Sequence, residues 1–330
     1  MKNTKTESEY LYIVKAIAIS SVVCAHCGNV PANSTVLNQV LSSLFGYWGT
    51  AGVPVFYFLS GYFFEKNSKS WTCFWKAKFK TIVVPWVSCA TMVWLYVVLR
   101  KGGITIASWF NFIVGNGSSL YYITVLLILY LVLFYLKRNK VICWILVCVS
   151  VIGIILAGEG YVWGRNTVSI YLNPIYWMGY FILGILIQKH SWMDRIRKFS
   201  NKSFLYMLVI WGSLCTVHYL GKIEWTYWSR YALFNIATEF IVIIGLAEQI
   251  NRARIMAHMV EVGKESYSIY LLHQLFVGIV VNISNYINWS ILTILRPILI
   301  IESLHILLTY IKSKDTRCAI VLRKIIGMRG

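Results

Sequence analysis

Long apolar segments recur along the whole chain, and they constrain its fold more than any other feature. A helix needs about 20 residues to cross roughly 30 Å of hydrocarbon. Segments of about this length lie near residues 11–30, 47–64, 81–99, 119–136, 141–158, 170–188, 204–220, 231–249, 266–287 and 291–311. With 58% hydrophobic and only 13% charged residues among 330, the chain has the composition of a polytopic membrane protein. We therefore expect an all-α membrane helix bundle of about ten transmembrane helices.

Basic residues are distributed unevenly among the segments that connect these helices. If the amino terminus is cytoplasmic, 24 of the 31 lysines and arginines fall in cytoplasmic segments and five in outer loops. This asymmetry follows the positive-inside rule, so we place both termini in the cytoplasm of a multi-pass protein of the cell membrane. The net charge of +19 then reflects topology and contact with anionic membrane lipids, and we expect no nucleic-acid partner.

The chain divides into two parts by composition. Residues 1–311 contain all the apolar segments, and we expect them to form one transmembrane domain. Residues 312–330 mix basic residues with isoleucine, leucine and valine, which is typical of an amphipathic helix on the inner membrane surface. Nothing in this basic cytoplasmic tail indicates a second catalytic domain.

Two ionisable side chains, Lys15 and His26, lie in the first apolar segment. Their spacing of eleven residues returns a helix to within about 20° of the same face and separates them by about 16 Å along the axis. Ionisable groups inside a membrane usually face a protein interior or a wet cavity and mark a site. The alternative is that Lys15 extends its ammonium group to the lipid headgroups, while His26 is a hydrogen-bonded interface residue.

Cysteines near His26 raise the question of a metal site. Cys24 and Cys27 flank the histidine, but no second group of ligands completes a tetrahedral set. We expect no metal, and we interpret the eight cysteines as small packing residues.

The second apolar segment is rich in small residues, including Gly49, Gly52 and Gly61. Such residues allow transmembrane helices to approach closely, and packing is a sufficient explanation for them. Ser60, beside Gly61, is a weaker candidate for a substrate-binding residue.

A basic stretch follows in which Lys76, Lys78 and Lys80 alternate with other residues. This stretch can simply satisfy the positive-inside rule. Its lysines can also serve as point charges for a phosphorylated cytosolic ligand.

Polar residues also enter later apolar segments. Ser266, Tyr270 and His273 are spaced at i, i+4 and i+7, which places them on one helical face. Glu239 lies near the middle of its segment and is a candidate for orienting His26 or an acceptor, because a carboxylate in lipid must be paired or face a cavity. Arg296 and Glu302 are interpreted as packing or inter-helix contacts.

Taken together, these motifs resemble the acyltransferase family 3 of integral-membrane O-acyltransferases. Four pieces occur in the family's order. They are Lys15 with His26, the Phe-Tyr-Phe-Leu-Ser-Gly-Tyr-Phe run at 56–63, the basic stretch leading to Val-Pro-Trp at 84–86, and the Ser-Tyr-Ser-Ile-Tyr-Leu-Leu-His run at 266–273. The resemblance spans nearly the whole chain.

The resemblance implies transfer of an acyl group, usually acetyl, from cytosolic acyl-coenzyme A to a hydroxyl of a surface polysaccharide or lipid-linked sugar. By analogy, His26 is the general base, since imidazole titrates near neutral pH, and Lys15 lies on the donor side. Lys76, Lys78 and Lys80 would hold the donor's phosphates. The family usually has arginine at position 15; lysine keeps the charge but loses the bidentate geometry.

Two rival functions use the same features. A transporter or exporter of a polar solute or glycan would also need ionisable residues along a path, but it predicts internal repeats with interrupted helices, and none is evident. A structural partner in a polysaccharide-synthesis complex would not require Lys15 and His26 to share a face.

Overall fold

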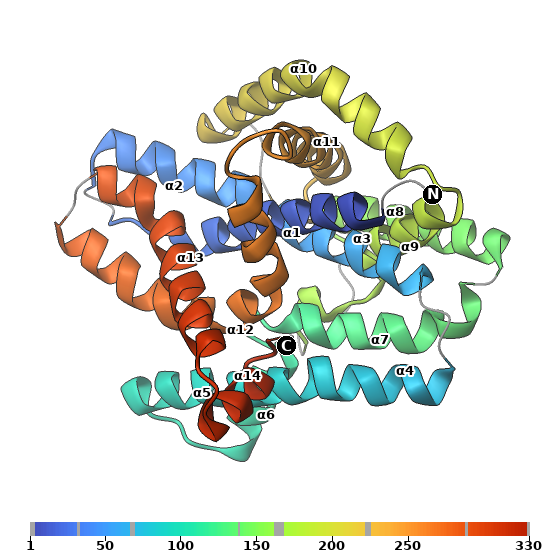
Figure 1. The fold of residues 1–330 in the computed structure, drawn as a ribbon. Coiled ribbons are helices and arrows are strands. Elements are labelled where there is room, and N and C mark those ends of the chain that lie inside the picture. The colour runs from blue at the N-terminus through green and yellow to red at the C-terminus, as the bar shows by residue number, and fades with distance from the viewer. Residues whose placement is uncertain are drawn as a thin grey trace.

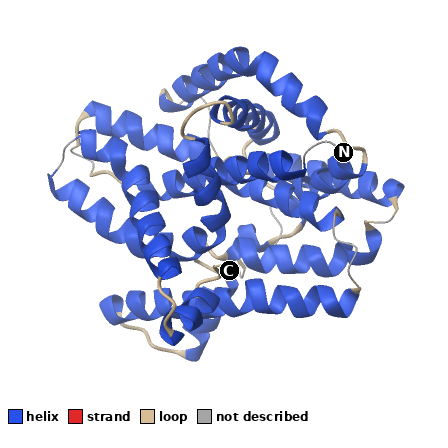
Figure 2. Cartoon of the chain, in the orientation of Figure 1, coloured by secondary structure: helices blue, strands red, loops and turns tan. Residues whose placement is uncertain are grey.

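The computed structural model of the chain describes residues 4–31, 34–66, 70–137, 139–161, 168–221, 226–287 and 290–328. Every regular element in these ranges is a helix (Figure 2), so the expected all-α class is confirmed. The elements are α1 (Thr4–Cys27), α2 (Val36–Gly49), α3 (Gly52–Glu65), α4 (Trp71–Lys78), η1 (Phe79–Val83), α5 (Val84–Lys101), α6 (Ile106–Val114), α7 (Tyr121–Leu136), α8 (Lys140–Gly158), η2 (Ile170–Leu172), α9 (Ile175–Lys189), α10 (Met193–Tyr219), α11 (Ala232–Ile250), α12 (Met256–Ile287), α13 (Ser290–Ser313) and α14 (Arg317–Ile325).

Within the described ranges, seven helical runs are long and apolar enough to cross a membrane. They are Glu7–Cys27, Trp71–Leu99, Lys140–Gly158, Ile170–Lys189, Ala232–Ile250, Met256–Ile287 and Ser290–Ser313. The expected count of about ten is not confirmed, because α3 and α7 have only 14 and 16 residues and α10 is not among the seven. Two basic residues assigned to outer loops, Arg165 and Lys222, lie outside the described residues, and the orientation of the termini stays a prediction.

Helix α1 lies in the middle of the bundle (Figure 1) and contacts α2, α3, α11, α12 and α13. Small residues bring two of these neighbours close. A Cβ atom added to Gly263 of α12 would lie 1.9 Å from the Tyr12 carbonyl oxygen, and one added to Gly52 of α3 would lie 2.5 Å from that of Ala18. The middle of α1, from Tyr12 to Ala18, is therefore enclosed by protein rather than by lipid.

Helices α3 and α9 form the second close pair. A Cβ atom at Gly61 would lie 1.9 Å from the Phe181 carbonyl oxygen, and a Cβ atom at Gly184 would lie 2.0 Å from that of Phe58. Each backbone thus occupies the space that the other's side chain would need. The interpretation of Gly61 as a residue of close helix approach is confirmed.

The second apolar segment differs from expectation because it is interrupted. The structure ends α2 at Gly49 and begins α3 at Gly52, whereas the sequence predicts one helix over 47–64. Pro54 accounts for the break, since it has no N–H to bond the Thr50 carbonyl and is tolerated only in the first turn of a helix.

The basic stretch belongs to one continuous helical run from Trp71 to Lys101 that contains a wider turn, η1. The Val84 N–H bonds to the Phe79 carbonyl, five residues earlier. Pro85 follows directly and lacks the N–H of a regular helical turn, which is a common cause of such irregularity.

The tail folds back onto the bundle. Its helix α14 contacts α5 and α13, and the Cys89 thiol donates to the Ile325 carbonyl at 3.6 Å. Ile326 is 2% exposed. The tail thus forms a helix as expected, and it packs partly against protein; its place at the inner membrane surface stays a prediction.

The α3–α9 contact can be tested with two alanine substitutions. Gly61→Ala forces the two helices apart and should lower the free energy of unfolding in detergent by about 1–3 kcal/mol or more. The matched control is Gly46→Ala, because Gly46 is a helical glycine with no atom within 4 Å of an added Cβ. Equal thermal midpoints for the two variants would contradict the close packing.

Candidate active site

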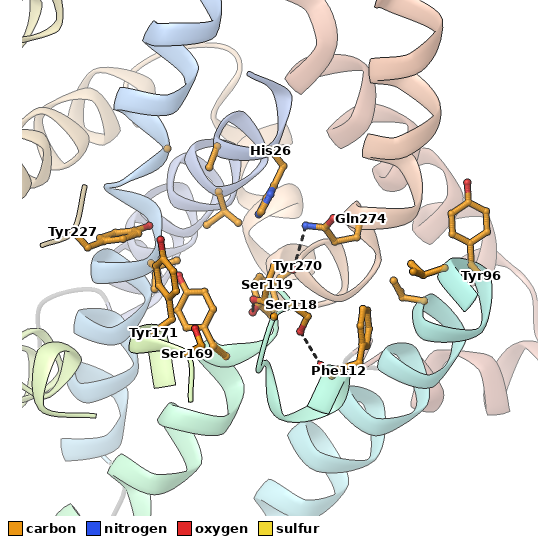
Figure 3. A pocket seen from close by; sticks show the side chains of 18 residues that line it. His26, Tyr96, Phe112, Ser118, Ser119, Ser169, Tyr171, Tyr227, Tyr270 and Gln274 are labelled. Atoms are coloured by element: carbon orange, nitrogen blue, oxygen red, sulfur yellow. Dashed lines mark hydrogen bonds between the residues drawn. The ribbon is translucent and has the colours of Figure 1, made fainter. Parts of the chain in front are cut away.

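His26 lies in the last turn of α1 and points into a cavity of about 570 Å³ (Figure 3). The cavity contains several hydroxyl and amide groups from other helices and loops. Its polar lining residues besides His26 are Tyr96, Ser118, Ser119, Tyr121, Ser169, Tyr171, Tyr227, Tyr270 and Gln274. We call this space the His26 cavity.

The half-buried His26 ring contacts a second histidine. The ring centroids of His26 and His273 are 5.1 Å apart, with the planes tilted by 43°. Among the residues that the structure describes, none hydrogen bonds to a ring nitrogen of His26. Its ring can therefore hydrogen bond with a molecule in the cavity.

His273, in contrast, is fully buried and fixed by hydrogen bonds. Its Nδ1 donates to the Tyr270 carbonyl at 2.5 Å, which leaves Nε2 as an acceptor. Gln274 donates from Nε2 to this nitrogen at 3.3 Å and to Ser119 Oγ at 3.2 Å. His273 is thus a rigid support behind His26.

A second cavity of about 290 Å³ lies on the side of Lys15. The Lys15 ammonium lies 4.5 Å from the centre of the Phe63 ring and 5.2 Å from that of Tyr12. The Lys78 ammonium lies 4.6 Å from the centre of the Tyr130 ring and 3.4 Å from its hydroxyl oxygen. We call this space the Lys15 cavity; its two cations are held by aromatic faces.

The three lysines of the basic stretch do not act as one cluster. Residues two apart on a helix face different sides, and only Lys78 lines the Lys15 cavity. Lys76 and Lys80 are exposed, and their role as phosphate ligands stays a prediction.

Tyr270 lines both cavities. Its hydroxyl donates to the Ser119 carbonyl at 2.5 Å, and its ring lies 5.5 Å from that of Tyr122. The Tyr122 hydroxyl hydrogen bonds with Ser60 Oγ at 3.0 Å. Tyr122 and Tyr270 therefore lie where the Lys15 and His26 cavities adjoin.

The structure distributes the predicted substrate-binding residues between the two cavities. Ser60 and Ser266 line the Lys15 cavity, whereas His273 lies beside His26. Ser60 belongs to α3, and Ser266, Tyr270 and His273 belong to α12, which extends from the Lys15 cavity to His26. Their contacts with substrate stay a prediction.

Glu239 is fully buried and lies outside the lining of both cavities. Its Oε2 accepts from Thr50 Oγ1 at 3.1 Å and its Oε1 accepts from Trp211 Nε1 at 3.4 Å. Thr50 lies at the break between α2 and α3, so Glu239 connects that break with α10. A catalytic role for it stays a prediction.

Several lining residues were not singled out from the sequence. Gln274 directly follows the Ser266–His273 pattern, and this position could have identified it as a candidate site residue. Ser119 and Tyr227 come from connections between helices and Tyr171 from the short helix η2, and their spacing in sequence gives no indication that they meet. Among the described residues, no group of three or more His, Cys, Asp or Glu is arranged to hold a metal ion.

Comparison with known proteins identifies the domain to which these residues belong. The family model described as an acyltransferase domain matches residues 8–304. Searches of curated proteins and of solved structures return no match.

The contacts of Glu239 predict a role in stability that can be measured. Glu239→Leu leaves the Trp211 indole N–H without its acceptor, which should lower the free energy of unfolding by about 1–3 kcal/mol. The control is Glu159→Leu, which removes an exposed ion pair with Arg230 and should hardly change the unfolding midpoint, because solvent screens such pairs. Thermal unfolding in detergent distinguishes the two; a Glu239→Leu midpoint at or above that of the parent protein would refute the structural role.

Proposed function

Since the chain belongs to this acyltransferase family, matched over residues 8–304, we propose that it moves an acyl group, in particular acetyl, from cytosolic acyl-coenzyme A to a hydroxyl of a surface polysaccharide or lipid-linked sugar at the cell membrane. One observation carries the proposal. Lys15 lies at the middle of one central helix, α1, and His26 lies in its last turn; each lines its own cavity, and the two cavities share Tyr270.

The donor enters from the Lys15 side. Acyl-coenzyme A is a highly anionic substrate with its thioester at the end of a long pantetheine arm. Lys15 and Lys78 supply positive charge at the Lys15 cavity, where charge-assisted contacts to phosphate are strong. The pantetheine arm then extends past Tyr122 and Tyr270 toward His26, about 16 Å farther along α1.

The acceptor binds in the His26 cavity. His26 takes the proton of the acceptor hydroxyl while the hydroxyl oxygen attacks the thioester carbonyl carbon. The C–O bond forms, the C–S bond breaks, and the leaving thiolate takes the proton back from His26. The products are the acyl ester and free coenzyme A, so no further reactant is needed.

The ring of His273 favours this use of His26. Because His273 Nε2 already accepts from Gln274, His273 does not compete for the acceptor's proton. The tyrosines of the cavity, Tyr171 and Tyr227 among them, offer both flat apolar faces and hydroxyl groups, which suits an acceptor that carries many hydroxyls.

The first test is loss of transfer in a His26 variant. Protein purified in detergent is given radiolabelled acetyl-coenzyme A and polysaccharide extracted from the surface of cells that express it, and label on the polysaccharide is counted. His26→Ala should lower kcat by at least about 10²-fold, as expected for loss of a general base.

The matched control for this test is His190→Ala. His190 stacks on Trp192 and lines neither cavity, so the variant should keep the parent rate. Full activity of a folded His26→Ala would overturn the mechanism. An inactive parent protein, with label on no fraction of the polysaccharide, would favour a transport function.

The second test compares the lysines of the basic stretch. Because only Lys78 faces the Lys15 cavity, Lys78→Met should raise KM for acetyl-coenzyme A about tenfold, the equivalent of one charge-assisted contact. Lys76→Met and Lys80→Met should have smaller effects, and Lys202→Met, on exposed α10 surface, should have none. A reversed order would place the phosphates outside the Lys15 cavity.

A further inference from the structure

The carbonyl groups at the end of α1, directly after His26, are held by a residue from a distant part of the chain. Arg296 of α13 donates from Nη1 to the Cys27 carbonyl at 2.9 Å and to the Asn29 carbonyl at 3.0 Å. The last carbonyls of a helix have no partner within the helix. Arg296 therefore satisfies the end of the very turn that carries His26.

Arg296 is itself held firmly. Its side chain is only 1% exposed, its Nε donates to Ser284 Oγ at 3.0 Å, and its Nη2 donates to Asn285 Oδ1. Asn285 also donates to the Asn29 carbonyl at 3.3 Å. Helices α12 and α13 thus bind the end of α1 through one connected hydrogen-bond network.

The charge of Arg296 has an unusual setting. Within the described residues its acceptors are two carbonyls, a hydroxyl and a side-chain amide, and none is a carboxylate. A buried cation without a counter-ion is costly. The carboxyl end of a helix carries the equivalent of about half a negative charge, so α1 is the group that stabilises this guanidinium.

A third helix fixes the carbonyl between these two. Ser42 of α2 donates its hydroxyl to the Gly28 carbonyl. Three consecutive carbonyls after His26 are therefore held by α13, α2 and α12. The His26 ring has no hydrogen bond from the described residues, so its direction depends on this backbone and on the contact with His273.

We propose that Arg296 is a positioning residue, whose guanidinium fixes the end of α1 and thereby the direction in which His26 enters its cavity. The inference rests on the proposed function, in which His26 acts on the acceptor hydroxyl. Arg296 reaches the reaction only through the backbone of α1. Its loss should therefore slow the chemical step and leave donor binding intact, because Lys15 lies about 16 Å from His26 along α1.

The test measures kcat and KM for acetyl-coenzyme A together with thermal unfolding. Arg296→Met should lower kcat by about 10–100-fold, because a misplacement of about 1 Å can cost about 10²-fold, with KM unchanged. Arg296→Lys keeps the charge but not the forked geometry, and it should recover part of kcat. The matched control is Arg252→Met, which removes an exposed arginine paired with Glu248 and should leave kcat and KM unchanged.

The outcomes separate this inference from the proposed function. If folded Arg296→Met keeps the parent kcat while His26→Ala is inactive, the positioning role alone is wrong. A merely structural role would instead lower the unfolding midpoint and weaken donor binding along with kcat. If Arg296→Met does not fold, Arg296→Lys and Asn285→Ala decide the matter: a loss confined to kcat supports the role, and parent kcat in both overturns it.

Discussion

The high cost of placing an ionisable side chain in hydrocarbon determines how this bundle is built. Helix α1 carries Lys15 and His26, and it can do so because five other helices surround it. Glycines at its contacts with α3 and α12 bring those neighbours to backbone distance. The same enclosure that makes the two side chains tolerable also creates the cavities that they face.

Helix α1 contributes one ionisable residue to each of two cavities that differ in chemistry. The Lys15 cavity holds two cations against aromatic rings, whereas the His26 cavity is lined by tyrosine, serine and amide groups. Tyr270 belongs to both. An anionic donor in the Lys15 cavity and a neutral acceptor with hydroxyl groups in the His26 cavity would therefore meet along α1. The end of α1 that carries His26 is fixed through the carbonyls that Arg296 and Ser42 hold.

Much of the site follows from helical periodicity alone. The placement of Lys15 and His26 on one stripe, and of Ser266, Tyr270 and His273 on one face, needs only the 3.6-residue repeat. The same repeat, applied to residues 76–80, places Lys78 on a different side of the helix from Lys76 and Lys80. These three lysines are close in sequence, but only Lys78 lines the Lys15 cavity. Contacts between distant segments could not be predicted from the sequence. Nothing in the sequence pairs Arg296 with Cys27, or Glu239 with Thr50, because such pairs depend on how helices pack and where the α2–α3 break falls.

The central claim is that one helix spans the path from donor phosphates to His26. A cryo-electron microscopy structure of the protein with a non-hydrolysable thioether analogue of acetyl-coenzyme A tests it most directly. We expect the phosphates near Lys15 and Lys78 and the pantetheine arm between Tyr122 and Tyr270. The ketone carbonyl that replaces the thioester carbonyl in the analogue should lie beside His26. An analogue bound with its acyl end away from His26, or confined to the polar cavity lined by Glu7, Arg197 and Arg252, would contradict the account.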